Sequence, residues 1–366
     1  CWSIWRVKNF QALRLLEANF LSPTLSGFKT LTGLFLLLCM DFKSKIFNIS
    51  NNKEFQEIAL EVFRYQFNNI KVYNEYVTLL GINPNSVDTI EKIPFLPIQF
   101  FKTHDVIGNN LSPEIVFTSS GTTGTETSKH QVSDVSLYVD SFTKGFELFY
   151  GKPSDYCILA LLPAYLERTG SSLVYMVDEL KKQSNNPNSG FFLNQYDELV
   201  DLLVKLNANR QKCLLIGVTF ALLDLAEKYN LNLKHTIVME TGGMKGRRKE
   251  MIREELHSIL CKSFGVEAIH SEYGMTELLS QAYSNGNGIF RCPPWMKILV
   301  RDPYDPLHSK TTASSGAINV IDLANVNSCS FIQTQDMGKL FADGSFEVMG
   351  RMDNAPIRGC NLLVYN

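Results

Sequence analysis

The stretch CLLIGVTFALLDLAEKYNLNLKHTIVMETGGM, residues 213–244, carries the pattern that decides the fold. Two short apolar runs, Cys213–Val218 and Thr236–Glu240, enclose an amphipathic segment at Leu222–Tyr229. Runs of this length are typical of strands buried on both faces, and the segment between them has helical spacing. The stretch therefore predicts a strand–helix–strand unit, which is the repeat of an α/β fold.

The same alternation extends to both sides of this unit. Further buried strands are predicted at Ile115–Thr118, Tyr156–Leu162 and Glu267–Tyr273. Further helices are predicted at Val135–Phe149, Tyr196–Leu206 and Arg247–Phe264. Alternation over this length predicts an α/β fold with doubly wound sheets flanked by helices. Ligands of such sheets bind at the carboxyl ends of strands, so we expect the chemistry in the loops that follow strands.

The chain divides into segments of different pattern. Residues 1–39 begin at Cys1 and hold scattered Arg and Lys before the apolar stretch Leu31–Cys39, which is far shorter than the roughly 20 residues of a membrane span. We expect them to be an extraneous extension ahead of a natural start at Met40, with a short amphipathic anchor as the alternative. The main domain is expected over 40–352, and a short C-terminal tail over 353–366.

Within the main domain three parts are expected. Residues 40–114 form a helical start, in which Asn51 and Glu54 resemble a capping box and the next residues make one apolar face, Phe55, Ile58, Val62 and Phe63. The Pro-broken stretch Ile93–Lys102 is expected to be a packed connection and not a helix. Residues 115–289 form the α/β core, with a surface loop at Asn185–Gly190. Residues 290–352 form a smaller β-rich subdomain of shorter strands separated by Gly, Pro and Asp turns.

Composition excludes several classes of protein. The 366 residues carry a formal net charge of -2, which gives no broad basic surface, so nucleic acid is not an expected partner. No stretch is long and apolar enough to predict a transmembrane segment. The eight cysteines form no CxxC pair, and several lie in apolar runs. This usage is typical of reduced, mostly buried thiols and indicates a cytoplasmic protein.

The strongest local signal is TSSGTTGTETSKH, residues 118–130, which directly follows a predicted strand. Its glycines permit a tight turn whose N–H groups converge on an anion, hydroxyls add donors, and Lys129 adds a positive charge. No Gly-Lys-Ser/Thr follows Gly121 at the Walker A spacing, which disfavours kinase-like or GTPase-like chemistry. The alternative is a solvated Ser/Thr linker without a binding function.

This loop resembles the phosphate loop of the adenylate-forming superfamily of acyl-CoA synthetases, luciferases and peptide-synthetase adenylation domains. The resemblance implies that Lys129 and the loop bind the phosphates of ATP. The loop residues with that implied role are Ser119, Ser120, Gly121, Thr122, Thr123 and Gly124. It also implies an N-terminal domain of the adenylate-forming type.

Two further loops after predicted strands match the superfamily. Gly242 and Gly243 follow TIVME, where the matching loop packs against adenine, although a plain β–α turn has the same sequence. The stretch Tyr273–Glu277, YGMTE, matches YGxTE and includes Gly274 and Met275 among the nucleotide-binding positions. The match implies that Tyr273 stacks on adenine, Thr276 contacts the α-phosphate and Glu277 helps to hold Mg²⁺, a hard cation that suits carboxylates. A helix with Thr276 as its N-cap is the alternative.

Two later motifs complete the order. Thr334 and Asp336 in QTQDMG match TxDxG, where the aspartate accepts hydrogen bonds from ribose. Gly350-Arg351-Met352-Asp353 matches GRxD, where Arg351 reaches the nucleotide and Asp353 marks a hinge. Five elements in this order make the resemblance specific. It covers the chain from roughly Ile93 to the end.

One branch of the superfamily accounts for the short tail. Most members continue into a mobile C-terminal domain, which we expect to be absent or vestigial here. The long-chain acyl-protein synthetases of bacterial luminescence end soon after GRxD, and IRGCNLL (357–363) resembles their tail. This resemblance implies that Cys360 accepts the acyl group; a small buried residue in a terminal strand is the alternative. FLPIQFFK, LLPAYLERTGSSLVYM and TGGMKG also resemble this branch.

The resemblance implies a ligase that needs ATP and Mg²⁺, with Cys360, Lys129 and Thr276 as catalytic residues. Such an enzyme activates a carboxylic acid, expected to be a fatty acid, as an acyl-adenylate. It then forms a thioester with a protein cysteine, and a reductase or an acyl carrier protein takes the acyl group from that thioester. Two alternatives stay open: transfer to CoA or acyl carrier protein, and a non-catalytic nucleotide- or acyl-binding subunit. Arg168 either orients the substrate carboxylate or pairs with Glu167 or Asp178.

Overall fold

The computed structural model describes residues 42–119, 127–163, 170–242, 251–305, 307, 309–310 and 313–352. The chain divides into two units, residues 1–45 and 46–366, and the helices and strands named here all belong to the second. Within the second unit, the described strands form a six-stranded sheet, a seven-stranded sheet and a two-stranded ribbon.

The six-stranded sheet is the predicted α/β core. Its order is β5-β4-β6-β7-β8-β9, with the first five strands parallel and β9 antiparallel to β8. The strands are β4 (Cys157–Leu161), β5 (Gly190–Phe192), β6 (Cys213–Val218), β7 (Thr236–Thr241), β8 (Ile269–Tyr273) and β9 (Ala282–Ser284). Every residue of β4 and β6 is buried, as continuous apolar runs require in a parallel sheet.

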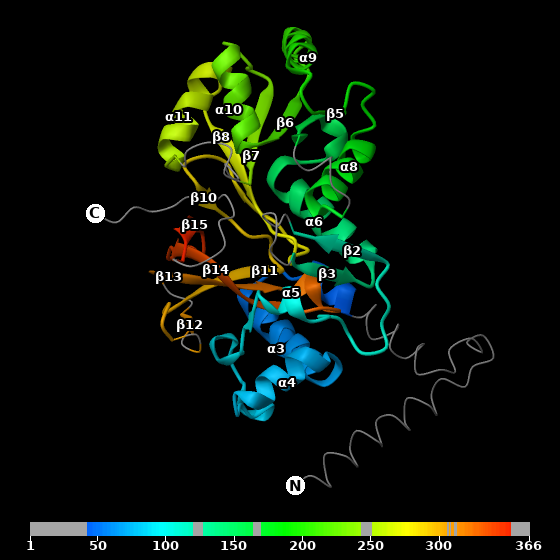
Figure 1. Cartoon of the computed structure of the whole chain (residues 1–366), viewed down its shortest axis with the longest axis vertical. Coiled ribbons are helices and arrows are strands. Elements are labelled where there is room, and N and C mark those ends of the chain that lie inside the picture. The colour runs from blue at the N-terminus through cyan, green and yellow to red at the C-terminus, as the bar shows by residue number, and fades with distance from the viewer. Residues whose placement is uncertain are drawn as a thin grey trace, which may run out of the picture. The chain divides into compact units, whose positions relative to one another are not determined.

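Helices cover both faces of this sheet. They are α6 (Val135–Tyr150), α8 (Ser172–Ser184), α9 (Tyr196–Ala208), α10 (Thr219–Lys228) and α11 (Arg253–Phe264). In Figure 1, α10 and α11 lie on one face of the strands, and α6 and α8 lie on the other. The predicted doubly wound α/β class is therefore confirmed. No described helix combines the length and the apolar character that crossing a bilayer would take.

The seven-stranded sheet contains the strands after the α/β core. Its main path is β10-β15-β14-β13-β11-β12, and β1 (Leu96–Pro97) adds to β14 in parallel. The other strands are β10 (Ile289–Phe290), β11 (Met296–Arg301), β12 (Ser309–Lys310), β13 (Ser314–Asp322), β14 (Phe331–Leu340) and β15 (Phe346–Arg351). Figure 1 shows α3 and α4 beside this sheet.

The prediction of shorter strands in this region was wrong, because β13 has 9 residues and β14 has 10. Two of their glycines serve close backbone approach and not turns. A Cβ on Gly316 would lie 2.3 Å from the carbonyl oxygen of Arg301, and one on Gly338 would lie 2.6 Å from that of Glu347. In these two strands glycine therefore permits close contact with a neighbouring backbone and does not indicate a turn.

The helical start consists of α3 (Asn52–Asn69) and α4 (Lys71–Leu79). Asn51 caps α3 as predicted and accepts a 3.0 Å bond from the N–H of Glu54. The Glu54 carboxylate reaches the N–H of Ser50 at 2.8 Å, one residue before the position that a capping box uses. Further along, Phe55, Val62 and Phe63 are buried, so the predicted apolar face packs inward.

Three other predictions are corrected. The strand β2 (Ile115–Thr118) pairs with β3 (Lys129–Val132) in a separate antiparallel ribbon, and Val116 is 37% exposed, so it is not a buried core strand. Helix α11 begins at Arg253 and not at Arg247, because Ile252 is extended with ψ 149°. The stretch Ile93–Lys102 is packed as expected, but it includes β1 and the first residues of a single helical turn, α5 (Phe100–Thr103).

Candidate active site

Two adjacent strands of the α/β core end at the same edge. β7 and β8 are parallel neighbours, so Gly242 and Gly274, which directly follow them, lie at the same edge of the sheet. The Thr241 hydroxyl donates to Oε2 of Glu272 at 2.6 Å and ties the two strand ends together. This edge is where a doubly wound sheet binds its ligands.

The ends of the seven-stranded sheet reach the same place. The Tyr273 hydroxyl donates to Oδ2 of Asp336 at 3.0 Å, and Nε of Arg351 lies 3.1 Å from Oδ1 of the same carboxylate. The Tyr273 ring packs edge-on against Phe290 and Phe346, with centroids 6.0 and 5.5 Å away. Three predicted nucleotide residues from three motifs are thus in direct contact.

Thr334 shapes the strand that carries Asp336. Its hydroxyl donates to the carbonyl of Ile318 at 2.8 Å and accepts the N–H of Asp336 at 3.1 Å. The pairing of β14 with β15 shifts register between Met337 and Gly338, directly after the aspartate. A bulge of this kind re-aims a side chain at a sheet edge.

The base of the predicted phosphate loop is the β2–β3 ribbon. Ser119 and Ser128 face each other across it: the Ser119 N–H donates to the carbonyl of Ser128 at 3.0 Å, and the Ser128 N–H donates to the Ser119 hydroxyl at 2.9 Å. Lys129 lies opposite Thr118 and is exposed. The ribbon therefore leaves Lys129 exposed, opposite the residue at which the predicted loop begins.

The YGMTE loop has no helix, so Thr276 is not an N-cap and that alternative is wrong. Thr276 and Glu277 form a turn, and the Glu277 side chain is buried. Beyond the turn, Oδ2 of Asp322 accepts the N–H groups of Leu279 and Ser280 at 2.7 and 2.9 Å. A carboxylate from the seven-stranded sheet thus fixes the far end of the loop.

His130 fixes the middle of the same loop, and the sequence analysis did not single it out. Nδ1 lies 2.8 Å from the carbonyl oxygen of Thr276, and Nε2 lies 2.9 Å from Oδ1 of Asn325. Burial lowers the pKa of His130 to about 4, although both contacts favour the charged ring. Both facing oxygens can only accept, so each ring nitrogen bonds its oxygen only where it carries a proton.

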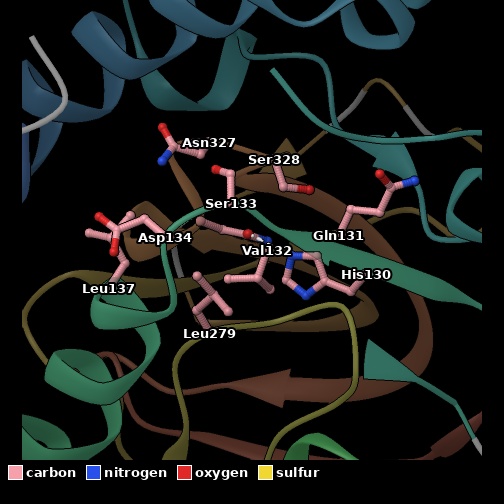
Figure 2. Close-up of a pocket in the computed structure, with 10 residues that line it drawn as sticks. His130, Gln131, Val132, Ser133, Asp134, Leu137, Leu279, Asn327 and Ser328 are labelled. Atoms are coloured by element: carbon pink, nitrogen blue, oxygen red, sulfur yellow. Dashed lines mark hydrogen bonds between the residues drawn. The ribbon is translucent and has the colours of Figure 1, made fainter. Parts of the chain in front are cut away.

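A cavity of about 10 Å³, room for roughly one water molecule, adjoins His130. Figure 2 shows that it lies between β3, the start of α6, Leu279 and the segment around Asn327 and Ser328. The segments on either side of it are far apart in sequence. Their packing explains how residues 325–328 come to support the YGMTE loop.

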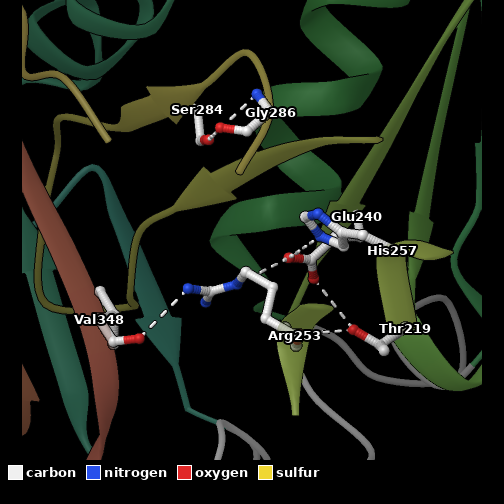
Figure 3. A network of polar contacts seen from close by, with 8 residues as sticks. Thr219, Glu240, Arg253, His257, Ser284, Gly286 and Val348 are labelled. Carbon is white, nitrogen blue, oxygen red and sulfur yellow. Dashed lines mark hydrogen bonds and ion pairs between the residues drawn. The ribbon is translucent and has the colours of Figure 1, made fainter. Parts of the chain in front are cut away.

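A buried polar network supports the predicted adenine loop (Figure 3). The Thr219 hydroxyl lies 3.1 Å from Oε2 of Glu240 and 2.8 Å from the carbonyl oxygen of Gly242. Oε1 of Glu240 lies 3.7 Å from Nε2 of His257 and 3.9 Å from Nε of Arg253. Burial raises the pKa of Glu240, but these two partners outweigh it and hold the pKa below its ordinary value.

Arg253 joins the two sheets in this network. Its Nη1 donates to the carbonyl oxygen of Val348 at 3.2 Å, on the strand that carries Arg351. Its guanidinium also lies over the Phe290 ring, 5.3 Å from the centroid. Arg253, the first residue of α11, therefore links Glu240 on β7 to Val348 on β15.

Glu272 is the second carboxylate at this edge. Burial raises its pKa to about 7, and the nearby charge of Glu240 adds to the effect, while the Thr241 hydrogen bond opposes it. The side chain lies over Gly274, where a Cβ would be 2.3 Å from Oε1 of Glu272. A side chain at Gly274 would therefore displace the Glu272 carboxylate from its present position.

The described residues fit a nucleotide with its divalent cation. Asp336 keeps free acceptor capacity, because an ionised carboxylate has about four lone-pair sites and two are used. No group of three His, Cys, Asp or Glu residues that would hold a metal occurs in the described part of the chain. Mg²⁺ bound with phosphates needs only one or two carboxylates, and Glu277 is the residue predicted for this role.

Several predicted site residues lie outside the described residues. They are Cys360, Arg168, Ser120, Gly121, Thr122, Thr123, Gly124 and Gly243. The hinge residue Asp353 is also outside, whereas Gly242, Gly274 and Met275 lie at the edge formed by β7 and β8. Their roles stay predictions.

Comparison with known proteins identifies one family. The model of the family described as acyl-protein synthetase, LuxE, matches residues 39–366. No curated protein matches the chain.

Solved structures of adenylate-forming ligases share the fold. A 2-hydroxyisobutyryl-CoA ligase in complex with 2-HIB-AMP and CoA is 13% identical with a TM-score of 0.62, over 84% of this chain and 70% of that chain. Its open conformation is 12% identical with a TM-score of 0.61, over 82% and 71%. The predicted adenylate-forming fold is confirmed by these likenesses.

A third similar structure is MatB from Rhodopseudomonas palustris bound to ATP. It is 17% identical with a TM-score of 0.48, and the match covers 64% of this chain. The chain spans 47% of the length of that protein.

Proposed function

Because the chain belongs to the acyl-protein synthetase (LuxE) family, we propose that it activates a carboxylic acid with ATP as an acyl-adenylate and then transfers the acyl group to a thiol. The observation that carries this proposal is the contact of Tyr273, Asp336 and Arg351, which brings three motif residues together at one sheet edge. In this proposal residues 40–352 form the adenylate-forming domain, and the tail 353–366 carries the acceptor.

The first half-reaction makes the acid electrophilic. A carboxylate oxygen of the acid attacks the α-phosphorus of ATP, the bond to the β-phosphate oxygen breaks, and pyrophosphate leaves. Lys129 and the donors of the loop after Ser119 stabilise the negative charge that builds up there, and Thr276 contacts the α-phosphate. Asp336 holds the ribose, and the loop at Gly242 packs against adenine.

Mg²⁺ in this site would neutralise phosphate charge as pyrophosphate leaves. Glu277 is the described residue that we assign to it. The match of YGMTE to the family's YGxTE pattern supports the assignment, because a carboxylate beside phosphate oxygens suits a hard divalent cation.

The second half-reaction moves the acyl group to sulfur. A thiolate attacks the acyl carbon, the bond to the phosphate oxygen breaks, and AMP leaves. We assign this thiolate to Cys360 in the tail. A free Cys has a pKa of about 8.5, and the neighbouring Arg351 or Arg358 would raise its thiolate fraction.

The partners follow from this chemistry. The acid is expected to be a fatty acid, whose carboxylate Arg168 orients, and the thioester is expected to pass to a reductase or an acyl carrier protein. We also propose a cytoplasmic location. It is supported by the described cysteines, Cys157, Cys213, Cys261, Cys292 and Cys329, all of which are free thiols.

Exchange of labelled pyrophosphate into ATP tests the first half-reaction. The chain is incubated with Mg²⁺, ATP and a panel of fatty and aromatic acids, and label in ATP is counted. Exchange that depends on one class of acid is expected. Absence of exchange with every acid, in folded protein, would overturn the proposed activity and favour a binding subunit.

The acyl acceptor needs a separate test. Cys360→Ser should keep exchange but lose the hydroxylamine-labile acyl-enzyme that forms from labelled acid and ATP. Cys157→Ser is a control, because that thiol is buried in β4 and should leave the acyl-enzyme intact. A Cys360→Ser variant that still forms the adduct, or a wild type that acylates only CoA, would favour transfer to CoA.

A further inference from the structure

The catalytic loop of the proposed reaction has little regular structure of its own. Between β8 and β9 a backbone hydrogen bond within the loop runs from the N–H of Leu278 to the carbonyl of Met275 at 3.1 Å. Two side chains from other elements contact the backbone of Thr276 and Glu277 and fix the turn.

Asn325 is the first of these side chains, and its orientation is fixed by its partners. Its amide nitrogen donates to the carbonyl oxygens of Glu277 and Cys329, both at 2.9 Å. Its amide oxygen must then face His130, because a flipped amide would set oxygen against two carbonyls. Nε2 of Gln66 holds the Asn325 backbone by donating to its carbonyl oxygen at 3.1 Å.

His130 is the second side chain. It reaches the carbonyl of Thr276 from β3, where it directly follows the exposed Lys129. The imidazole is fully buried, and Phe101 packs edge-on against it at 5.6 Å between centroids. Packing of this kind restricts the rotamers of the ring.

Together the two side chains contact consecutive carbonyl oxygens of the loop. The Thr276 oxygen faces His130, and the Glu277 oxygen faces Asn325. The Thr276 carbonyl belongs to the peptide plane before the Glu277 Cα, and the Glu277 carbonyl belongs to the plane after it. Fixing both planes therefore fixes the direction in which the Glu277 side chain leaves the backbone. His130 also links this turn to the strand of Lys129.

We propose that His130 and Asn325 are positioning residues that set the Thr276–Glu277 turn for binding the divalent cation and the α-phosphate. The inference rests on the proposed function, because it assigns the support of that same site. Neither residue touches the reacting atoms in this scheme. Loss of a supporting contact of this kind typically lowers metal affinity or activity roughly 10- to 100-fold.

The test compares His130→Leu and Asn325→Ala with Tyr73→Phe. The buried hydroxyl of Tyr73 donates to the carbonyl oxygen of Pro94 at 2.7 Å, and not to Asn325 or the loop. Its loss should lower stability without moving the turn. Two readouts are taken: binding of Mn²⁺ to the protein–ATP complex by electron paramagnetic resonance, and the maximal pyrophosphate exchange rate at saturating ATP.

We expect His130→Leu and Asn325→Ala to weaken Mn²⁺ binding and to lower the maximal rate, each about tenfold or more. Tyr73→Phe should keep both values near wild type, even where its melting temperature falls as far as in the other two variants. Equal losses in Tyr73→Phe, or wild-type values in the two variants, would overturn the inference. If His130→Leu does not fold, His130→Met replaces it, and wild-type Mn²⁺ affinity in that variant is the overturning result.

Failure of the proposed function gives a different pattern. Wild-type protein that exchanges no pyrophosphate with any acid would remove the enzymatic proposal. Weaker Mn²⁺–ATP binding in His130→Leu and Asn325→Ala, with binding retained in Tyr73→Phe, would still support positioning of the turn.

Discussion

The Tyr273 hydroxyl donates a 3.0 Å hydrogen bond to Asp336, although the two residues are 63 positions apart in the chain. One belongs to the α/β core and the other to the seven-stranded sheet. The bond therefore joins the two sheets at the edge where the nucleotide is proposed to bind.

Tyr273→Phe removes this bond and keeps the ring contacts. We expect the free energy of unfolding to fall by about 1–2 kcal/mol, because a buried carboxylate oxygen loses its donor. Urea denaturation measures the change. Tyr229→Phe is the control, since the hydroxyl of Tyr229 donates to Asp197 at an exposed position, and its loss should have little effect. A similar change in both variants would contradict the expectation.

Glu272→Gln should change stability in a way that depends on pH. Burial raises the pKa of Glu272 to about 7, whereas the carboxyl of an unfolded chain titrates near 4.5. Below pH 4.5 both states are protonated, and the wild type carries no penalty. As pH rises from 4.5 to 7 the unfolded state ionises first, so the wild type becomes less stable, by at most about 3 kcal/mol.

Glutamine keeps an acceptor for Thr241 and cannot ionise. The variant should therefore unfold like the wild type near pH 4.5 and be the more stable of the two at pH 8, as measured by urea denaturation at both values. A difference that does not change with pH would refute the raised pKa. Glu198→Gln, at an exposed position of α9, serves as the control.

Two glycines should respond to alanine in opposite directions. Gly145 lies inside α6 with nothing within 4 Å of a new Cβ, so Gly145→Ala should stabilise by about 0.5–1 kcal/mol. Gly316→Ala sets a Cβ 2.3 Å from a backbone oxygen of Arg301, which cannot rotate away, and should destabilise by more than about 2 kcal/mol. Thermal unfolding measures both, and a tolerated Gly316→Ala would contradict this account.

Thr219 should affect nucleotide binding through Gly242. Thr219→Val keeps the shape but removes the hydroxyl that faces Glu240 and the Gly242 carbonyl, so we expect a loss of about 1–3 kcal/mol in stability and a higher KM for ATP. Thr219→Ser retains the hydroxyl and should restore the KM. A serine variant with the valine phenotype would show that the methyl group matters and not the hydrogen bond.

The core strands could be predicted because their signal is local. Cys213–Val218 is an uninterrupted apolar run, and its bounds are those of β6. The run Ile115–Thr118 was also located correctly, but an apolar run does not say which partner a strand takes, and β2 pairs in the separate ribbon. In the sequence, the glycines of β13 and β14 cannot be told from glycines in turns, although their role is to let neighbouring strands approach closely.

In the candidate site, only the residues that belong to sequence motifs could be predicted. Tyr273, Asp336 and Arg351 belong to recognisable stretches, and they do meet. His130 and Asn325 contact the same region, but His130 is 146 positions from Thr276 and 195 from Asn325. Contacts at such separations depend on how the sheets pack, and no periodicity or spacing in the sequence encodes them.

The pairing of early and late segments has a consequence for synthesis of the protein. Gln66 on α3 bonds to Ser330, 264 positions later, and β1 joins β14 in parallel. While the ribosome is still adding the residues between them, the apolar face of α3 has no sheet to cover it. The α/β core can fold during translation, but the helical start must wait, exposed to chaperones and to aggregation, until β14 emerges.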